Sequence, residues 1–213
     1  QCGSSQQAVH FAAQGVMAGA YDLVIACGVE SMTRAPMASN ARGGTGPFSP
    51  AFLAACDNQL KMQFEVAQKI ANDWGITRAE MDAFAIESHR RASEAQKAGA
   101  FKREIVPITL RDEEGKDTGV VMTDDEGIRH ETSAEKMASL PSAHFVPEDA
   151  PDITAGNSSQ MNDGAAAMLI ASPEMAEKLG LRPRAKFRHF AVGADSAVWV
   201  LTAPNPVTRK LYA

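Results

Sequence analysis

The chain has 213 residues, 45% of them hydrophobic and 22% charged, which is ordinary for a globular protein able to bury a core. A net charge of −5 gives no sign of a nucleic-acid partner or an anionic membrane surface, and no apolar run is long enough to cross a bilayer. The three cysteines stand at irregular spacing, which predicts neither a disulfide framework nor a zinc site, so we expect an intracellular protein.

The chain opens with a predicted helix and strand. Apolar residues recur at helical spacing from Ala8 to Met17, and Gly19 is a plausible helix end. The apolar run of residues 23–27 shows no alternation, which is typical of a strand buried on both faces of a parallel sheet. Gly28 then predicts a tight turn. Together these segments indicate an α/β core.

Cys2 is the first candidate for chemistry, because it stands directly before the predicted helix. Free N–H groups and the positive end of a helix dipole both lower the pKa of a thiol and favour its nucleophilic thiolate. The alternative is an inert small residue at a helix start. Cys27, within the strand, and Cys56 are expected to be ordinary packed cysteines.

The middle of the chain is predicted to be rich in loops and helices. Residues 31–50 form a loop by composition, and residues 66–74 carry a helical stripe that includes Trp74. Thr77 and Glu80 form a capping box that begins a further helix. Its inward residues are predicted to be Met81, Phe84, Ala85, Ser88 and Ala92, with Gly99 at its end.

A strand and a short helix follow in the predicted order. Residues 105–110 are strand-like, and Pro107 indicates an edge position. Thr132 and Glu135 match a second capping box, whose helix Pro141 ends. We therefore predict that residues 31–148 are a helical, loop-rich insertion between two pieces of α/β core, residues 1–30 and 149–213.

The last part of the chain predicts a return to the core. Residues 165–171 form a strand after an Asn-Asp-Gly turn, and residues 185–192 are another strand candidate. Between them, residues 173–180 are predicted to be a helix with Gly180 as its cap. Asn205 is predicted to cap a helix that has Pro206 in its first turn. Because the chain begins at the edge of one element and stops within another, we expect it to be a fragment.

Residues 155–167, AGNSSQMNDGAAA, are the second candidate site. Small residues allow a slender ligand to approach the backbone closely, and the amide and hydroxyl groups offer hydrogen bonds. The alternative is a turn that leads into a buried strand. No phosphate-cradling glycine motif is present in the sequence.

Several stretches, taken together and in order, resemble the thiolase family of acetyl-CoA acetyltransferases and 3-ketoacyl-CoA thiolases. QCGSSQQAV resembles the segment around the acyl-accepting cysteine, and GVESMTRAP resembles a block after it. Further matching stretches are GITRAEMDAFAIESHRRA, FKREIVP, NSSQMNDGAAA and LTAPNPVTRK. The resemblance extends over nearly the whole chain.

The resemblance implies a layered α/β/α/β/α fold with an inserted loop domain that covers coenzyme A, incomplete in this chain. It implies that Cys2 attacks a 3-ketoacyl-CoA, holds the acyl group as a thioester and passes it to a second CoA. The reverse reaction is a Claisen condensation of acetyl-CoA. Coenzyme A is then a co-substrate, and we expect neither a metal site nor a permanently bound cofactor.

Four binding residues are assigned by this resemblance. Arg129 falls where the loop domain contacts the nucleotide end of CoA, and Ala155, Gly156 and Ser159 fall where the pantetheine arm lies. Ser159 is the expected hydrogen-bond donor among them. The family's further asparagine, histidine and second cysteine belong after Ala213.

The sequence leaves an alternative to catalysis open, and the family resemblance implies ligands and an assembly. A non-catalytic acyl-CoA-binding relative, or an inactive fragment, is the alternative to a working acyltransferase, and retention of Cys2 favours the enzyme. The family implies acyl-CoA and CoA as ligands, a homodimer or homotetramer, and no membrane insertion. We expect a cytoplasmic location, with the mitochondrion or peroxisome as alternatives.

Overall fold

The computed structural model describes residues 3–44, 46–143 and 148–213. It forms two compact units: Gln1–Lys61 together with Met161–Ala213, and Met62–Gln160. The expected insertion of residues 31–148 stays a prediction. In the described ranges, no helix combines the length and the apolar character that a membrane span requires.

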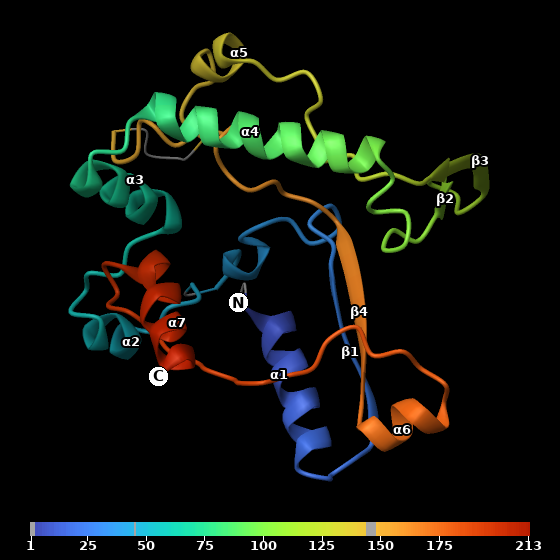
Figure 1. The fold of residues 1–213 in the computed structure, drawn as a ribbon. Coiled ribbons are helices and arrows are strands. Elements are labelled where there is room, and N and C mark those ends of the chain that lie inside the picture. The colour runs from blue at the N-terminus through green and yellow to red at the C-terminus, as the bar shows by residue number, and fades with distance from the viewer. Residues whose placement is uncertain (1–2, 45, 144–147) are drawn as a thin grey trace. The chain divides into compact units, whose positions relative to one another are not determined.

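The first unit is built on a helix that packs against a two-stranded sheet (Figure 1). Its elements are α1 (Ser4–Met17), β1 (Leu23–Glu30), η1 (Ser39–Ala41), α2 (Pro50–Ala55), β4 (Gly164–Ala171), α6 (Pro173–Lys178), η2 (Val200–Thr202) and α7 (Pro204–Tyr212). Gly19 and Gly180 adopt φ values of +72° and +64° after α1 and α6, so the predicted glycine helix ends are confirmed.

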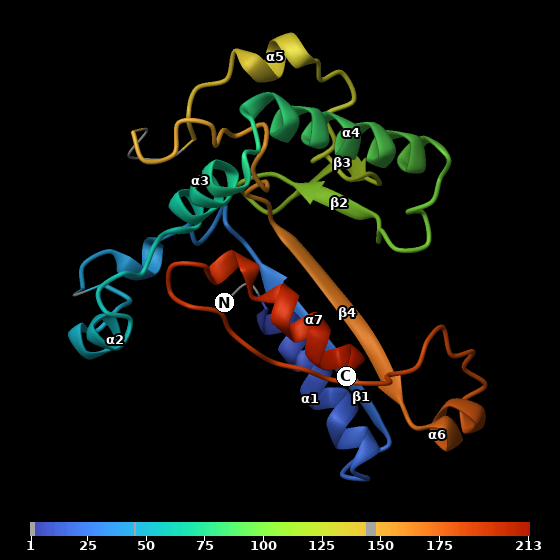
Figure 2. The ribbon, with the colours of Figure 1, turned by 60° about the vertical axis from the view of Figure 1, so that its left-hand side comes forward.

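Strands β1 and β4 pair antiparallel along their whole length, from Leu23 opposite Ala171 to Glu30 opposite Gly164. Figures 1 and 2 both show α1 running alongside this pair. Small residues dominate the contact between α1 and the strands. Ala13 of α1 and Ala26 of β1 are buried together with Ile170 of β4 in the core of the unit. Small side chains let the helix and the strands approach closely.

Two predictions about β1 were wrong. The strand is not part of a parallel sheet in the structure, and its alternate residues Ile25, Cys27 and Val29 are exposed. A continuous apolar run does not distinguish a strand buried on both faces from one with a single covered face. Gly28 lies within β1 rather than in a turn; a Cβ there would stand 2.5 Å from Ser5 Oγ, so glycine permits the close approach of α1.

The Met62–Gln160 unit contains helices and a β-hairpin. Its elements are α3 (Gln63–Trp74), α4 (Arg78–Lys97), β2 (Ile108–Arg111), β3 (Asp117–Met122) and α5 (Ala134–Ala138). The antiparallel pairing of β2 with β3 places Ile108 opposite Met122. Strand β2 begins at Ile108, directly after Pro107, and not at residue 105 as predicted, because proline has no N–H to donate to a strand partner. The short helix α5 contacts α4.

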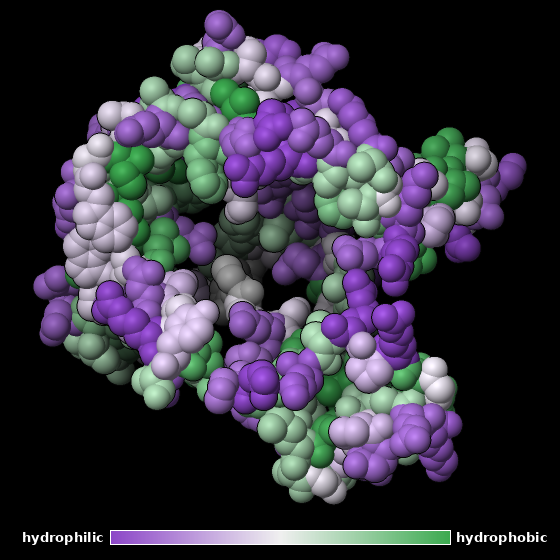
Figure 3. Space-filling view, in the orientation of Figure 1, coloured by the Kyte–Doolittle hydropathy of each residue, from purple (hydrophilic) through white to green (hydrophobic). Residues whose placement is uncertain are grey.

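The inward face of α4 is polar, which contradicts the sequence prediction. Asp82 and Ser93 are buried, with 6% and 5% of their surface exposed, whereas Phe84 is 80% exposed and Ser88 is also exposed. Trp74 on α3 is 58% exposed and was wrongly assigned to a packed stripe. Hydrophilic side chains also gather over the visible outer side of α4 (Figure 3). The helix is thus held through hydrogen bonds more than through an apolar stripe.

Three smaller predictions were also wrong. Ser133, not Thr132, caps α5, because its hydroxyl accepts a hydrogen bond from the Lys136 N–H. Residues 185–192 form no strand. Helix α7 begins at Pro204 after Ala203, so Asn205 lies in its first turn instead of capping it. Both cap predictions are displaced by one or two residues, which is the usual uncertainty of helix ends. The strand prediction rested on one short apolar run, which does not define a strand by itself.

We predict that Thr77→Ala lowers the free energy of unfolding by about 1 kcal/mol, because it removes the N-cap of α4. The Thr77 hydroxyl accepts a hydrogen bond from the Glu80 N–H, and the Thr77 N–H donates to the Glu80 carboxylate at 2.8 Å. That backbone bond lowers the pKa of Glu80 from the ordinary value of a glutamate carboxyl. The stability contributed by the carboxylate is therefore present at neutral pH and is lost as the pH falls through the lowered pKa.

Urea denaturation at pH 7 measures the effect of Thr77→Ala, with Thr77→Ser as the matched control that keeps the hydroxyl. Equal midpoints for the alanine variant and the unsubstituted protein would contradict the assignment of this cap.

Candidate functional site

A cavity of about 680 Å³ lies within the Met62–Gln160 unit. Three segments form its wall: α4 through His89, the stretch of residues 128–140, and the stretch of residues 155–160. These segments are distant in sequence. The cavity therefore forms only when the chain that follows the β2–β3 hairpin packs against α4.

The cavity brings together three of the five predicted site residues. Arg129, Ala155 and Gly156 all line it. Ser159 is exposed and does not line it; its neighbours Ser158 and Gln160 do. Cys2 lies outside the described residues. The roles of all five residues stay predictions, but the two sequence stretches proposed for CoA contacts do meet at one cavity.

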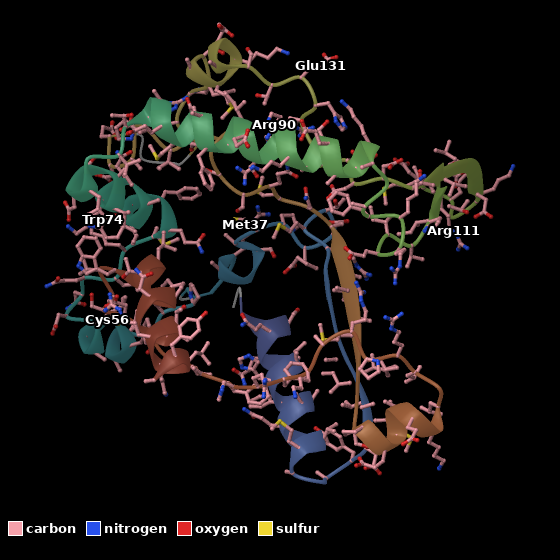
Figure 4. All side chains as sticks on the ribbon, in the orientation of Figure 1. Met37, Cys56, Trp74, Arg90, Arg111 and Glu131 are labelled. Carbon is pink, nitrogen blue, oxygen red and sulfur yellow. The ribbon has the colours of Figure 1, made fainter. Side chains whose placement is uncertain are left out.

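Basic and donor groups dominate the polar part of the cavity wall. Arg129 and Lys136 carry positive charge, His89 and His130 add imidazole rings, and Glu131 is the one acidic residue among the described lining residues. Glu131, labelled in Figure 4, stands two residues after Arg129, and its carbonyl accepts a hydrogen bond from Lys136 Nζ at 2.8 Å. Such a wall suits a ligand that carries phosphate groups.

No metal site accompanies the cavity in the described part of the chain, since no group of three or more His, Cys, Asp and Glu side chains there could hold an ion. The wall offers positive charge and hydrogen-bond donors in place of metal ligands. Positive charge and hydrogen-bond donors of this kind suit an anionic ligand.

Asn157 shapes the segment that carries Ala155 and Gly156. Its side-chain oxygen accepts a hydrogen bond from the Thr154 N–H at 2.8 Å, and its amide nitrogen donates to the Asp152 carbonyl at 2.9 Å. The same amide nitrogen donates to Asp82 Oδ1 at 3.0 Å. These bonds satisfy polar backbone groups in a buried turn and fix that turn on α4.

Asp82 connects this turn to the other side of the cavity. Its second carboxylate oxygen accepts a hydrogen bond from Arg78 Nε at 2.8 Å, and Arg78 in turn donates to the carbonyl of Met137 at 2.7 Å. The pair is largely shielded from solvent, with 22% of the Arg78 side chain and 8% of the Asp82 side chain exposed. One ion pair thus supports two segments of the cavity wall.

Gly156 is needed for packing beneath the cavity. A Cβ at this position would stand 2.6 Å from both Met137 Sδ and Leu140 Cδ1. Met137 and Leu140 both line the cavity. A side chain at position 156 would therefore displace these two side chains of the wall.

Three side chains of α4 that were not predicted from the sequence hold the turn of Arg129. His89 Nδ1 accepts a hydrogen bond from the Arg129 N–H at 3.2 Å, and Ser93 Oγ lies 2.8 Å from His130 Nδ1. Gln96 also donates to the Asp125 carbonyl at 3.3 Å. Positions 82, 89, 93 and 96 follow helical spacing, so a search for a polar helix face could have found them.

The other unit contains a contact between two stretches of the family resemblance. Asp163 Oδ1 accepts a hydrogen bond from the Thr33 N–H at 2.9 Å, and its Oδ2 lies 3.2 Å from Ser31 Oγ. The Thr33 N–H is the main cause of a lowered pKa for Asp163, and the Ser31 hydroxyl adds to it. This carboxylate holds the loop after β1 to the turn before β4.

We predict that Asp82→Ala lowers the free energy of unfolding by about 3 kcal/mol or more, because it leaves the shielded Arg78 guanidinium without its carboxylate. Glu94→Gln is the control, because Glu94 pairs with Arg90 on the exposed side of α4 (Figure 4). Thermal or urea denaturation monitored by circular dichroism compares the two. A loss in the Glu94 variant as large as that in the Asp82 variant would refute this role of the pair.

Comparison with known proteins adds a family match. The family description "Thiolase, N-terminal domain" matches residues 1–174. The chain is 41% identical over 210 residues to a 3-ketoacyl-CoA thiolase of Marinobacter nauticus, which covers 98% of this chain and 51% of that protein. It is 39% identical over 216 residues to the steroid 3-ketoacyl-CoA thiolase FadA6 of Mycobacterium tuberculosis, at 98% and 50% coverage.

A solved structure is similar as well. The acetyl-CoA acetyltransferase of Syntrophomonas wolfei superposes with a TM-score of 0.75 and 33% identity, covering 99% of this chain and 54% of that one. The chain thus spans about half the length of the curated relatives that it matches.

Proposed function

Since this chain belongs to the thiolase family, we propose that the protein is an acyltransferase that cleaves 3-ketoacyl-CoA to acyl-CoA and acetyl-CoA, or runs the reverse condensation. Cys2 is the proposed carrier of the acyl group. The observation that supports the proposal most is the cavity in the Met62–Gln160 unit, because Arg129 lines it together with Ala155 and Gly156.

The proposed reaction uses two substrates, 3-ketoacyl-CoA and CoA, and the thiolate of Cys2. The Cys2 thiolate attacks the ketone carbon, the bond from that carbon to the neighbouring methylene breaks, and the acetyl-CoA carbanion leaves and takes up a proton. A second CoA thiol then gives up a proton and attacks the acyl-cysteine thioester. Acyl-CoA leaves and the Cys2 thiolate is restored. Because no electron acceptor is consumed, coenzyme A as co-substrate is sufficient.

The sequence position of Cys2 supports its role as nucleophile. Helix α1 begins at Ser4, and its first turn contains no acidic residue. Gly3 at the N-cap has no side chain that could occupy the first backbone N–H groups. Within the described residues, the first turn of α1 thus carries no acidic side chain, and a positive helix end favours the thiolate form of a cysteine that precedes the helix.

The cavity supports binding of the CoA nucleotide. Arg129 and Lys136 provide cationic groups for phosphates, as a guanidinium can bind a phosphate through two parallel hydrogen bonds. Ala155 and Gly156 offer backbone groups with small side chains, which suits close contact with a slender pantetheine arm. Ser158, rather than Ser159, is the lining hydroxyl in this segment.

Assembly and location remain part of the proposal. A homodimer or homotetramer is proposed from the family, and the cytoplasm is the proposed compartment, because the two curated relatives named above come from bacteria. A mitochondrial or peroxisomal location is the alternative. The chemistry proposed for Cys2 depends neither on the oligomeric state nor on the location.

We predict that the natural protein gains one acetyl group on Cys2 when it is incubated with acetyl-CoA. Intact mass spectrometry detects the adduct, and peptide mapping locates it. Cys2→Ser should abolish both the adduct and thiolysis, whereas Cys56→Ser, at the end of α2, should retain both. An adduct that persists without the Cys2 thiol would contradict the proposed nucleophile, and absence of any adduct would favour the non-catalytic alternative.

We also predict that Arg129→Ala raises KM for acyl-CoA by roughly ten-fold, since it removes a charge-assisted hydrogen bond, and leaves kcat within about two-fold. Steady-state kinetics with 3-ketoacyl-CoA measure both constants. The matched control is Arg111→Ala on the exposed hairpin (Figure 4), where Arg111 pairs with Asp117 at 3.3 Å. An unchanged KM in the Arg129 variant would refute the assignment of the nucleotide site.

A further inference from the structure

The turn that carries Arg129 is fixed to α4 by two side chains one helical turn apart. His89 Nδ1 accepts the Arg129 N–H at 3.2 Å, and Ser93 Oγ lies 2.8 Å from His130 Nδ1. Ser93 is 5% exposed, so the second bond lies at the base of the turn. Consecutive residues of the turn are therefore bound by residues i and i+4 of one rigid helix.

We propose that His89 is a positioning residue that holds the backbone of Arg129, and thereby sets the affinity of the site for acyl-CoA. The proposal rests on the function proposed above. A hydrogen bond to the backbone N–H fixes where the Arg129 side chain begins, whatever that side chain binds. Loops that bind ligands gain affinity when they are held in the bound conformation beforehand, because less conformational entropy is then lost on binding.

The geometry also specifies which atom of His89 matters. Because the backbone N–H of Arg129 is the donor, His89 Nδ1 must accept and carries no proton. In a neutral ring the proton then resides on Nε2. Asparagine presents an oxygen on Cγ, where histidine has Nδ1, so it retains an acceptor at that position. Leucine fills similar space but offers no acceptor. The two substitutions therefore separate the hydrogen bond from packing.

His89 also lines the cavity, so direct contact with the ligand is the competing explanation. A double-mutant cycle separates the two explanations. If His89 acts through Arg129, then His89→Leu has little further effect once the Arg129 side chain is removed. If His89 contacts the ligand independently, the two effects on KM multiply.

The experiment is steady-state thiolysis by the natural protein and its His89→Leu, His89→Asn, Arg129→Ala and His89→Leu/Arg129→Ala variants. We expect His89→Leu to raise KM for 3-ketoacyl-CoA about two- to ten-fold, with kcat unchanged, as for the loss of one hydrogen bond. His89→Asn should return KM to within about two-fold of the unsubstituted protein, and the double variant should match Arg129→Ala. Circular dichroism confirms that each variant is folded.

Specific outcomes would overturn the inference. An unchanged KM in a folded His89→Leu variant, or multiplicative effects in the double variant, would refute positioning while leaving the proposed function intact. Equal defects in the leucine and asparagine variants would also refute it, because the acceptor would then be irrelevant. Absence of thiolysis by the unsubstituted protein would refute the proposed function and, with it, this inference.

Discussion

The buried carboxylate of Asp82 is the interaction on which the arrangement of the Met62–Gln160 unit depends. It binds the Arg78 guanidinium on its own helix and the Asn157 amide of a distant turn. A buried charge of this kind is tolerated only when its oxygens are occupied by donors, and both are. The pair therefore aligns the start of α4, the end of α5 and the turn that carries Ala155 and Gly156 at the same time.

This constraint explains why the inner face of α4 is polar. The chain that returns along the helix is mostly irregular, so its backbone groups need hydrogen-bond partners that an apolar helix face does not offer. His89, Ser93 and Gln96 bind the stretch of residues 125–130, and Asp82 binds the later turn. The cavity wall is thereby fixed without a large apolar core, and its basic groups are available for a ligand.

Local signals predicted most of the elements but misplaced the caps of α5 and α7, and they did not reveal contacts between segments that are distant in sequence. The Thr77–Glu80 capping box and the glycines after α1 and α6 were correct, because they depend on neighbouring residues. The antiparallel partner of β1 lies about 140 residues away in sequence, which no periodicity reveals. The inward face of α4 was misassigned because the prediction sought apolar residues. The thiolase-like α/β class and the family followed from ordered motifs and are confirmed by the comparisons.

We propose that the cavity of the Met62–Gln160 unit binds coenzyme A. A crystal structure of the natural protein with coenzyme A tests it most directly. We expect the nucleotide in this cavity, with phosphate oxygens near the Arg129 guanidinium and the pantetheine arm beside Ala155 and Gly156. Coenzyme A bound elsewhere, with the cavity occupied by water alone, would contradict it.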